Sequence, residues 1–169
     1  MRRFVASGVS AISLLLCAAL VTAAPASARE QVKRGEYLAA IMDCGGCHTD
    51  GTLLGKPDPR RHLGGSQVGF QIPGLGIFYP PNLTPDVDTG LGTWSEDDIV
   101  TAVRTGVRPD GRVLAPVMPY HSYGKLTDAD ARALASYLKD IEPVRHEVPA
   151  ITGPSEKATA PYLGVVMPD

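Results

Sequence analysis

The chain contains little of what marks several large classes of protein. Only 6% of its 169 residues are aromatic, and its formal net charge at pH 7 is -2. Nucleic-acid-binding proteins need a dense basic surface to displace counterions from phosphates, so this charge balance argues against that class. A chain of 169 residues supports one modest hydrophobic core and hardly two, so we expect a single folded domain.

Cysteine is scarce as well, since the whole sequence contains only Cys17, Cys44 and Cys47. Three cysteines do not form the multi-bridge framework of a small disulfide-rich protein. Cys17 follows leucines at 14–16, which lack the small side chain expected ahead of a lipidated cysteine, so we expect no lipid anchor there.

The first residues have the features of an export signal. Met1-Arg2-Arg3 is basic, residues 4–24 are mostly apolar, and Ala26-Ser27-Ala28 gives an A-x-A ending. This order predicts a secretory signal peptide over residues 1–28 that is cleaved after Ala28. An apolar run of this length also matches the thickness of a bilayer, so a retained membrane anchor stays open as the alternative.

Three later segments have the spacing of amphipathic helices. Apolar residues three and four apart follow Glu30, and the pairs Ser95 with Asp98 and Thr127 with Asp130 have the form of helix N-caps. Gly and Pro mark where the last two segments stop. We therefore expect helices over about 30–44, 95–106 and 127–143.

The remaining segments are rich in glycine and proline. Residues 49–92 show no sustained period of 3.6 or 2, which predicts a long irregular loop. Loops of this length in a compact domain are usually functional or disordered, and one that wraps a bulky ligand would have a reason to exist. Residues 144–169 are again dotted with Pro and Gly, which predicts an extension that lies on the domain or is left free.

One motif indicates a cofactor. Cys44-Gly45-Gly46-Cys47-His48 has the C-x-x-C-H spacing by which c-type haem is attached. One turn of helix presents the two thiols to the two vinyl groups of the macrocycle, and the histidine directly after the second thiol falls beneath the iron. The motif therefore predicts a covalent haem c on Cys44 and Cys47, with His48 as the proximal iron ligand.

Three other interpretations of the two cysteines are weaker. A thioredoxin-like redox pair would follow a strand in a βαβ unit, whereas a helical pattern precedes Cys44. A zinc site would need more ligands at close spacing, yet His62, His121 and His146 are scattered singly. A disulfide across two intervening residues is strained and closes almost no loop.

The second axial position of the iron is predicted from the methionines. Met118 stands between Pro116 and Pro119, whose rings restrict the backbone, so we expect an extended strand that presents one thioether. His121, Met167 and an open iron position remain as alternatives. A thioether ligand raises the reduction potential relative to a second imidazole, so the site is predicted to be a moderately high-potential one-electron relay.

Several strings together resemble a known family. They are EYL at 36–38, CGGCH at 44–48, PNLTPD at 81–86, TGLG at 89–92, WS at 94–95, GRVL at 111–114, MPY at 118–120, LTD at 126–128 and YL at 137–138. Over about residues 32–143 the chain resembles the class I cytochrome c domains that serve periplasmic gluconate, alcohol and sorbitol dehydrogenases. CxxCH is common to all c-type cytochromes, whereas PNLTPD, the TGLG-W-S run and MPY are more particular to this branch.

The resemblance implies a fold and a ligand set. It implies an all-α, small cytochrome c fold, with three main helices and long loops around one covalently bound haem, over a domain of residues 30–143. His48 and Met118 would be the axial ligands of the haem iron. Subunits of those dehydrogenases often carry three such domains and an anchoring tail, whereas this chain has one CxxCH, so we expect a mono-haem carrier.

The function expected from these observations is electron transfer. We expect an exported, periplasmic cytochrome c that moves single electrons between a dehydrogenase and a respiratory oxidase or another carrier. The alternatives are a cytochrome subunit of a membrane-associated dehydrogenase complex and a haem enzyme or gas sensor with an open distal site. No nucleophile or acid/base pair is evident, so an independent enzyme is not predicted.

Family analogy gives further residues a role. Gly35 would let the first helix approach the third closely near Tyr137, because a missing Cβ permits backbone contact, and the alternative is an ordinary glycine that only weakens the helix. Four other residues are candidates for shielding the haem edge or bonding its propionates, although Trp94 and Tyr79 could equally be plain core: Tyr79, Trp94, Asn82 and Arg104.

Overall fold

The structure is a computed structural model, and it describes residues 28–168. Its helices are α1 (Ala28–Ile41), α2 (Cys44–His48), α3 (Glu96–Thr105), α4 (Tyr120–Tyr123) and α5 (Asp128–Asp140), and its strands are β1 (Gly69–Ile72), β2 (Gly76–Phe78) and β3 (Tyr162–Leu163). Single turns of 3₁₀ helix occur at Thr52–Leu54 and Pro59–Arg61. The predicted signal peptide and Cys17 lie outside the described residues, apart from Ala28. Within 28–168, no helix is long and apolar enough to cross a bilayer.

The three helices predicted from periodicity are present as α1, α3 and α5. The first ends at Ile41 rather than at Cys44, because Asp43 adopts a left-handed conformation with φ 54° that interrupts the helix. A separate short helix, α2, therefore begins at Cys44. The change of direction between α1 and α2 sets the orientation of the CGGCH segment independently of the long helix.

Both predicted N-caps are confirmed. The Ser95 hydroxyl accepts a hydrogen bond from the backbone N–H of Asp98, and the Asp98 carboxylate accepts one from the backbone N–H of Ser95, which completes a capping box. The Thr127 hydroxyl accepts from the backbone N–H of Asp130 in the same way. Gly106, in the left-handed conformation, ends α3 where the sequence indicated.

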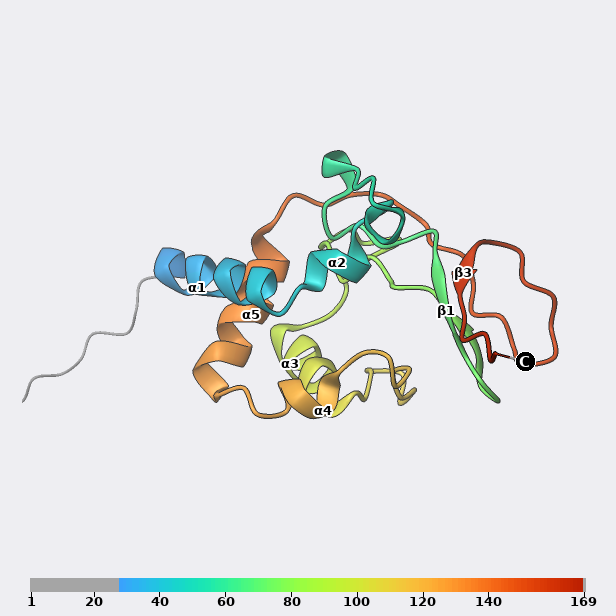
Figure 1. The fold of residues 1–169 in the computed structure, drawn as a ribbon. Helices are drawn as coiled ribbons and strands as arrows, with labels where there is room; N and C mark the ends of the chain where they lie inside the picture. The colour runs from blue at the N-terminus through green and yellow to red at the C-terminus, as the bar shows by residue number, and fades with distance from the viewer. Residues whose placement is uncertain (1–27, 169) are drawn as a thin grey trace, which may run out of the picture.

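The core lies mainly between α1, α3 and α5 (Figure 1). Its buried residues are Ala39, Leu63, Leu91, Ile99, Leu134, Ala135, Tyr137 and Leu138. The crossing of α1 and α5 is close at Gly35, where a Cβ would lie 2.0 Å from the Ala133 carbonyl oxygen and 2.6 Å from the Tyr137 Cβ. The expectation for Gly35 is confirmed, since only glycine permits this approach of the two helices.

The expectation of an all-α fold missed a small sheet. The segment predicted as irregular loop contains β1 and β2, which pair antiparallel with Phe70 opposite Phe78 and Ile72 opposite Gly76. These strands have four and three residues, too few to show a period of 2 along the sequence. Five helices, two of them short, surround the core of the described part, rather than three helices and loops alone.

The C-terminal extension was expected either to lie on the domain or to be left free. Its described part lies on the domain. It runs from the end of α5 past the loops to the sheet (Figure 1). There β3 pairs parallel with β1, and the sheet order is β2-β1-β3. A segment without a clear sequence pattern thus completes the sheet.

The close helix crossing gives a testable prediction. Gly35→Ala should lower the free energy of unfolding by about 1–3 kcal/mol, because the added methyl group overlaps the backbone of α5 and this outweighs the better helix propensity of alanine. Urea unfolding measures the change. Lys33→Ala, at an exposed position of the same helix, is the control and should change the stability by less than about 0.5 kcal/mol. Equal stability of the two variants would contradict the packing described here.

Candidate functional site

The CGGCH segment forms one short helix whose two thiols are free. Cys44 and Cys47 stand at the two ends of a single turn, and both side chains are partly buried. Asp43 folds its carboxylate back over the turn, where a Cβ on Gly46 would lie 2.3 Å from Asp43 Oδ2. The small residues between the cysteines therefore have a steric reason, at least at Gly46.

The thiols are neutral in this setting. Burial raises the pKa of Cys44 to about 11, and the nearby Asp43 carboxylate adds to the rise. Burial also raises the pKa of Cys47, again with a contribution from Asp43. Both cysteines are therefore protonated at neutral pH and do not have the lowered pKa of a redox-active thiol pair, which counts against the thioredoxin-like interpretation.

His48 is buried and held by one hydrogen bond. Its Nδ1 donates to the Pro81 carbonyl oxygen at 2.8 Å. Burial lowers the pKa of the imidazole, although the bond to Pro81 acts in the opposite direction. With the proton on Nδ1, the lone pair of Nε2 is left for a metal, which is the arrangement common to histidine ligands.

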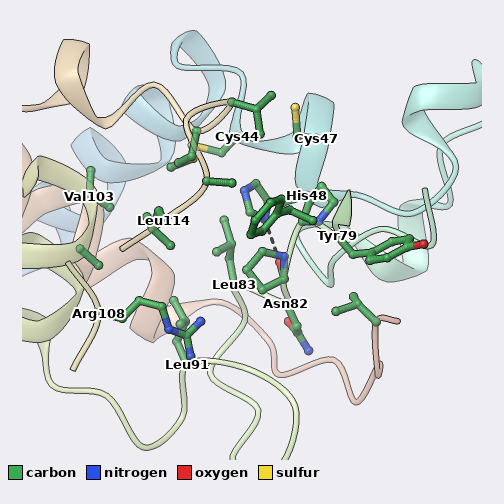
Figure 2. Close-up of a pocket in the computed structure, with 18 of the residues that line it drawn as sticks. Cys44, Cys47, His48, Tyr79, Asn82, Leu83, Leu91, Val103, Arg108 and Leu114 are labelled. Carbon is green, nitrogen blue, oxygen red and sulfur yellow. Dashed lines mark hydrogen bonds between the residues drawn. The ribbon is translucent and has the colours of Figure 1, made fainter. Parts of the chain in front are cut away.

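The three residues of the motif line one large cavity of about 460 Å³. Figure 2 shows Cys44, Cys47 and His48 on one side of it, with Leu83, Leu91 and Leu114 around the same space. Other walls come from the sheet, through Phe70 and Phe78, and from α3 and α5. The volume and the largely apolar lining suit a sizeable apolar cofactor.

Met118 also lines this cavity and is half-buried. The sequence predicts that Met118 lies in an extended strand, but the structure has a turn there. The backbone N–H of Met118 donates to the Ala115 carbonyl oxygen at 2.9 Å, which closes a turn with Pro116 at its second position. Proline favours that position because its φ is already fixed near the required value. Pro116 thus constrains Met118 through a turn.

The other candidates for the second axial position do not reach the cavity. His121 is exposed and its ring lies beside Tyr120, with 4.3 Å between the ring centroids. Met167 is 77% exposed near the end of the described chain. Among the described residues that line the cavity, His48 is the only histidine, and Met42, two positions before Cys44, is the only methionine besides Met118.

Two of the four secondary candidates have other tasks. The Asn82 side-chain amide lines the cavity, but its two N–H groups are used by Thr89 Oγ1 and the Val144 carbonyl oxygen. It is a structural tie between two loops. Arg104 pairs with Asp128 at 2.6 Å and is not among the residues that line the cavity, so the expected contact with a haem propionate is wrong there.

Tyr79 and Trp94 do line the cavity, as the sequence suggested. The Tyr79 hydroxyl donates to the Ala160 carbonyl oxygen at 3.2 Å. The guanidinium of Arg108 lies 5.1 Å from the centroid of the Trp94 ring, within the range of a cation–π contact.

Two arginines were missed by sequence reasoning. Arg108 and Arg112 line the cavity on either side of a turn, where the Arg108 N–H donates to the Arg112 carbonyl oxygen. Burial and the neighbouring charge of Arg108 lower the pKa of Arg112, although the group stays a cation. In the sequence they stand in the string RPDGR at 108–112, which by itself does not indicate that the turn reaches the cavity.

Lys139 holds part of the cavity wall in place. Its ammonium donates to the carbonyl oxygens of Leu91, Gly92 and Trp94, at 3.1, 2.9 and 2.8 Å. All three of its donors are thus used by one loop, which presents Leu91 and Trp94 to the cavity. This lysine ties the loop to α5.

Comparison with known proteins finds one matching family model and relatives that are cytochromes. A family model described as "Cytochrome c" matches residues 32–142. The chain is 37% identical over 126 residues to the cytochrome c subunit of alcohol dehydrogenase (quinone) from Gluconobacter oxydans, covering 73% of this chain and 24% of that protein. It is 43% identical over 114 residues to the gluconate 2-dehydrogenase cytochrome c subunit from Pantoea cypripedii, covering 67% and 24%.

A third relative is a diheme cytochrome c-type protein from Cereibacter sphaeroides, with 28% identity over 151 residues that cover 85% of this chain and 50% of that protein. The chain spans about a quarter of the length of the two dehydrogenase subunits. These matches confirm the resemblance indicated by the motifs.

The three hydrogen bonds of Lys139 should contribute measurably to stability. Lys139→Met should lower the free energy of unfolding by about 2 kcal/mol or more, because it leaves three carbonyl oxygens of one loop without their charged donor. Chemical denaturation measures the loss. Arg132→Met removes an exposed ion pair with Asp97 from the same helix and should cost less than about 1 kcal/mol. If the lysine variant were as stable as the arginine variant, the loop would not depend on Lys139.

Proposed function

The chain belongs to the cytochrome c family, and from this premise we propose that it is an exported electron carrier with one covalent haem c. It passes single electrons between a dehydrogenase and a respiratory oxidase or another carrier. The observation that carries the proposal is the placement of Cys44, Cys47 and His48 side by side on the wall of a large apolar cavity.

Each residue of the motif has a distinct task in this proposal. Cys44 and Cys47 form the two thioether bonds, and their neutral, partly buried thiols lie one helical turn apart. His48 would hold the iron through Nε2, since the Pro81 carbonyl oxygen fixes the other ring nitrogen. Met118, on the wall of the same cavity, would supply the second protein ligand of the iron. Haem, when bound, supplies the one-electron couple of its iron.

The surrounding residues tune the site rather than perform chemistry. The apolar walls, among them Leu83, Leu91 and Leu114, exclude water and so keep the polarity around the cofactor low. Arg108 and Arg112 offer cations on the cavity wall that suit the carboxylates of a haem. The role needs no nucleophile and no acid/base pair, so the chain acts as a carrier and the partner performs catalysis.

The partners follow from the relatives. Two of them are named as cytochrome c subunits of an alcohol dehydrogenase and a gluconate dehydrogenase, so the proposed electron donor is a dehydrogenase of this general kind. One CxxCH motif in the sequence supports one haem. Residues 1–28 support export to the periplasm, where an uncleaved N-terminal segment would add association with the membrane.

The attachment is tested by removing both thiols. The wild-type protein, produced in a host that matures c-type cytochromes, should keep its haem on a denaturing gel, where haem staining detects it. The double variant Cys44→Ala/Cys47→Ala should show no stain, because neither thioether bond forms. Stain at the same intensity in the double variant would refute the assignment of the two cysteines.

The second axial ligand is tested by exchanging its donor atom. Met118→His should abolish the far-red charge-transfer band of a ferric His–Met haem and lower the reduction potential by on the order of 0.1 V, because imidazole stabilises ferric iron better than a thioether does. Spectroelectrochemistry measures both. His121→Ala is the control and should leave band and potential unchanged. A wild-type protein that lacks the band and binds carbon monoxide freely would instead favour a gas-binding haem site.

A further inference from the structure

The C-terminal extension forms part of the cavity wall. Residues 148–151, Val148-Pro149-Ala150-Ile151, line the same space as Cys44 and His48. This segment belongs to the part of the chain that follows α5 and lies beyond the region matched by the cytochrome c family model, which ends at residue 142. The pocket of this protein therefore has a wall that the family domain does not itself supply.

The beginning of this segment is fixed by polar contacts. The Val144 N–H donates to Thr84 Oγ1 at 3.0 Å, and the Val144 carbonyl oxygen accepts from Asn82 Nδ2 at 2.6 Å. Arg145 forms an exposed ion pair with Asp88. The extension is thus bound to the loop that carries PNLTPD at Val144, four residues before residues 148–151 begin.

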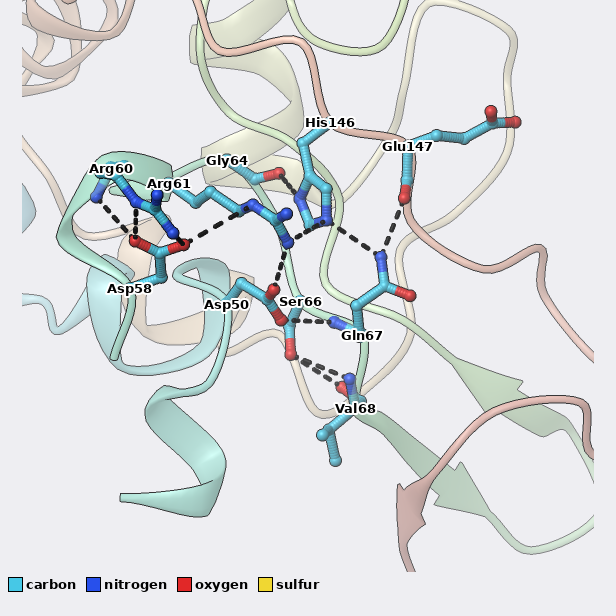
Figure 3. Close-up of polar contacts among 10 residues, drawn as sticks. All are labelled: Asp50, Asp58, Arg60, Arg61, Gly64, Ser66, Gln67, Val68, His146 and Glu147. Carbon is cyan, nitrogen blue, oxygen red and sulfur yellow. Dashed lines mark hydrogen bonds and ion pairs between the residues drawn. The ribbon is translucent and has the colours of Figure 1, made fainter. Parts of the chain in front are cut away.

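His146 makes the densest set of these contacts (Figure 3). Its Nδ1 donates to the Gly64 carbonyl oxygen at 2.8 Å, and its Nε2 accepts from Gln67 Nε2 at 3.0 Å and from Arg61 Nη1 at 3.3 Å. This pattern uses the neutral ring with its proton on Nδ1. The same Gln67 amide donates to the Glu147 carbonyl oxygen at 2.9 Å.

The partners of His146 are themselves held firmly. Arg61 Nη1 donates to Asp50 Oδ2 at 2.7 Å, and the Gln67 backbone N–H donates to Asp50 Oδ1 at 3.3 Å. Asp50 lies two residues after His48, so the network connects the extension to the segment that follows the attachment helix. His146 therefore binds the extension to residues that are themselves hydrogen-bonded to Asp50.

The C-terminal end of residues 148–151 is hydrogen-bonded to the sheet. Ile77 and Thr152 exchange two backbone hydrogen bonds, at 2.8 and 3.1 Å. The fit is close, because a Cβ on Gly76 would lie 2.2 Å from the Thr152 carbonyl oxygen and one on Gly65 would lie 2.5 Å from Val148 Cγ1. Residues 148–151 are thus bound at both ends, at His146 and at Thr152.

We propose that residues 144–163 form a strap that closes the haem pocket, and that His146 is the positioning residue that holds the strap against the domain. This rests on the proposed function, since it takes the cavity to be the haem site. A seated strap keeps water away from the cofactor and so disfavours the more highly charged ferric state. Loosening the strap should therefore lower the reduction potential.

The first test removes the histidine from the purified holo-protein. His146→Ala should lower the amide-exchange protection at positions 146 and 152, whose N–H groups donate to Thr89 Oγ1 and to the Ile77 carbonyl oxygen, by about tenfold or more, because the side-chain hydrogen bonds to residues 61–67 are lost. It should also lower the reduction potential, a readout that a purely structural contact far from the pocket would not change. His121→Ala, at an exposed histidine outside the cavity, should leave both quantities at their wild-type values.

The second test disrupts the contact between the strap and the sheet at Thr152 and leaves His146 unchanged. Gly76→Ala places a methyl group against the Thr152 carbonyl oxygen and should lower protection and potential in the same direction. Gly74→Ala is a matched control, since Gly74 also has a positive φ and lies in the same hairpin, but a Cβ there meets nothing within 4 Å. This control should behave as the wild type does in both measurements.

The outcomes separate the strap from the haem assignment. A normal haem spectrum with unchanged protection and potential in both His146→Ala and Gly76→Ala would overturn the strap and leave the proposed function intact. Lost protection with an unchanged potential would show a fastened segment that does not influence the haem, which also overturns it. If Gly76→Ala fails to fold, His146→Ala decides alone. A colourless wild-type protein would overturn the proposed function and the strap together.

Discussion

The hydrogen bond between His48 Nδ1 and the Pro81 carbonyl oxygen is the contact on which the rest of the site depends. It joins α2 to the PNLTPD loop, fixes which ring nitrogen carries the proton, and orients a buried, neutral imidazole. Pro81 is followed by Asn82, whose amide binds Thr89 and the start of the C-terminal segment. Because these ties share one loop, the position of the imidazole is coupled to the walls of the cavity around it.

The helices serve this site by fixing its loops. The glycine crossing of α1 and α5 brings the two helices into backbone contact, and α1 leads directly into α2. From the same α5, Lys139 holds the loop that presents Leu91 and Trp94. The Tyr123 hydroxyl donates to the Met42 carbonyl oxygen at 2.9 Å and so ties α4, just beyond Met118, to the junction of α1 and α2. The loop around residues 91–94 is thus held by a side chain from a helix.

Sequence alone predicted the features with local causes. Helical spacing and the caps at Ser95 and Thr127 predicted three helices, and the spacing of Cys44, Cys47 and His48 singled out a segment that the structure places on the cavity wall. What depends on contacts between distant residues was missed or wrong. The strands β1 and β2 are too short for a period, and β3 pairs with β1 from more than 90 residues away. Arg104, a candidate for contact with a propionate, instead pairs with Asp128 outside the cavity. Arg108 and Arg112 gave no distinct pattern, since only the fold brings that turn to the cavity.

The central claim is that a porphyrin is bonded to the CGGCH helix of this chain, and the most direct measurement is the intact mass of the protein after denaturation. The account predicts a mass that equals the processed polypeptide plus one haem, with the added mass retained on the proteolytic peptide that contains residues 44–48. A protein with the mass of the polypeptide alone, from a host that matures other c-type cytochromes, would contradict it.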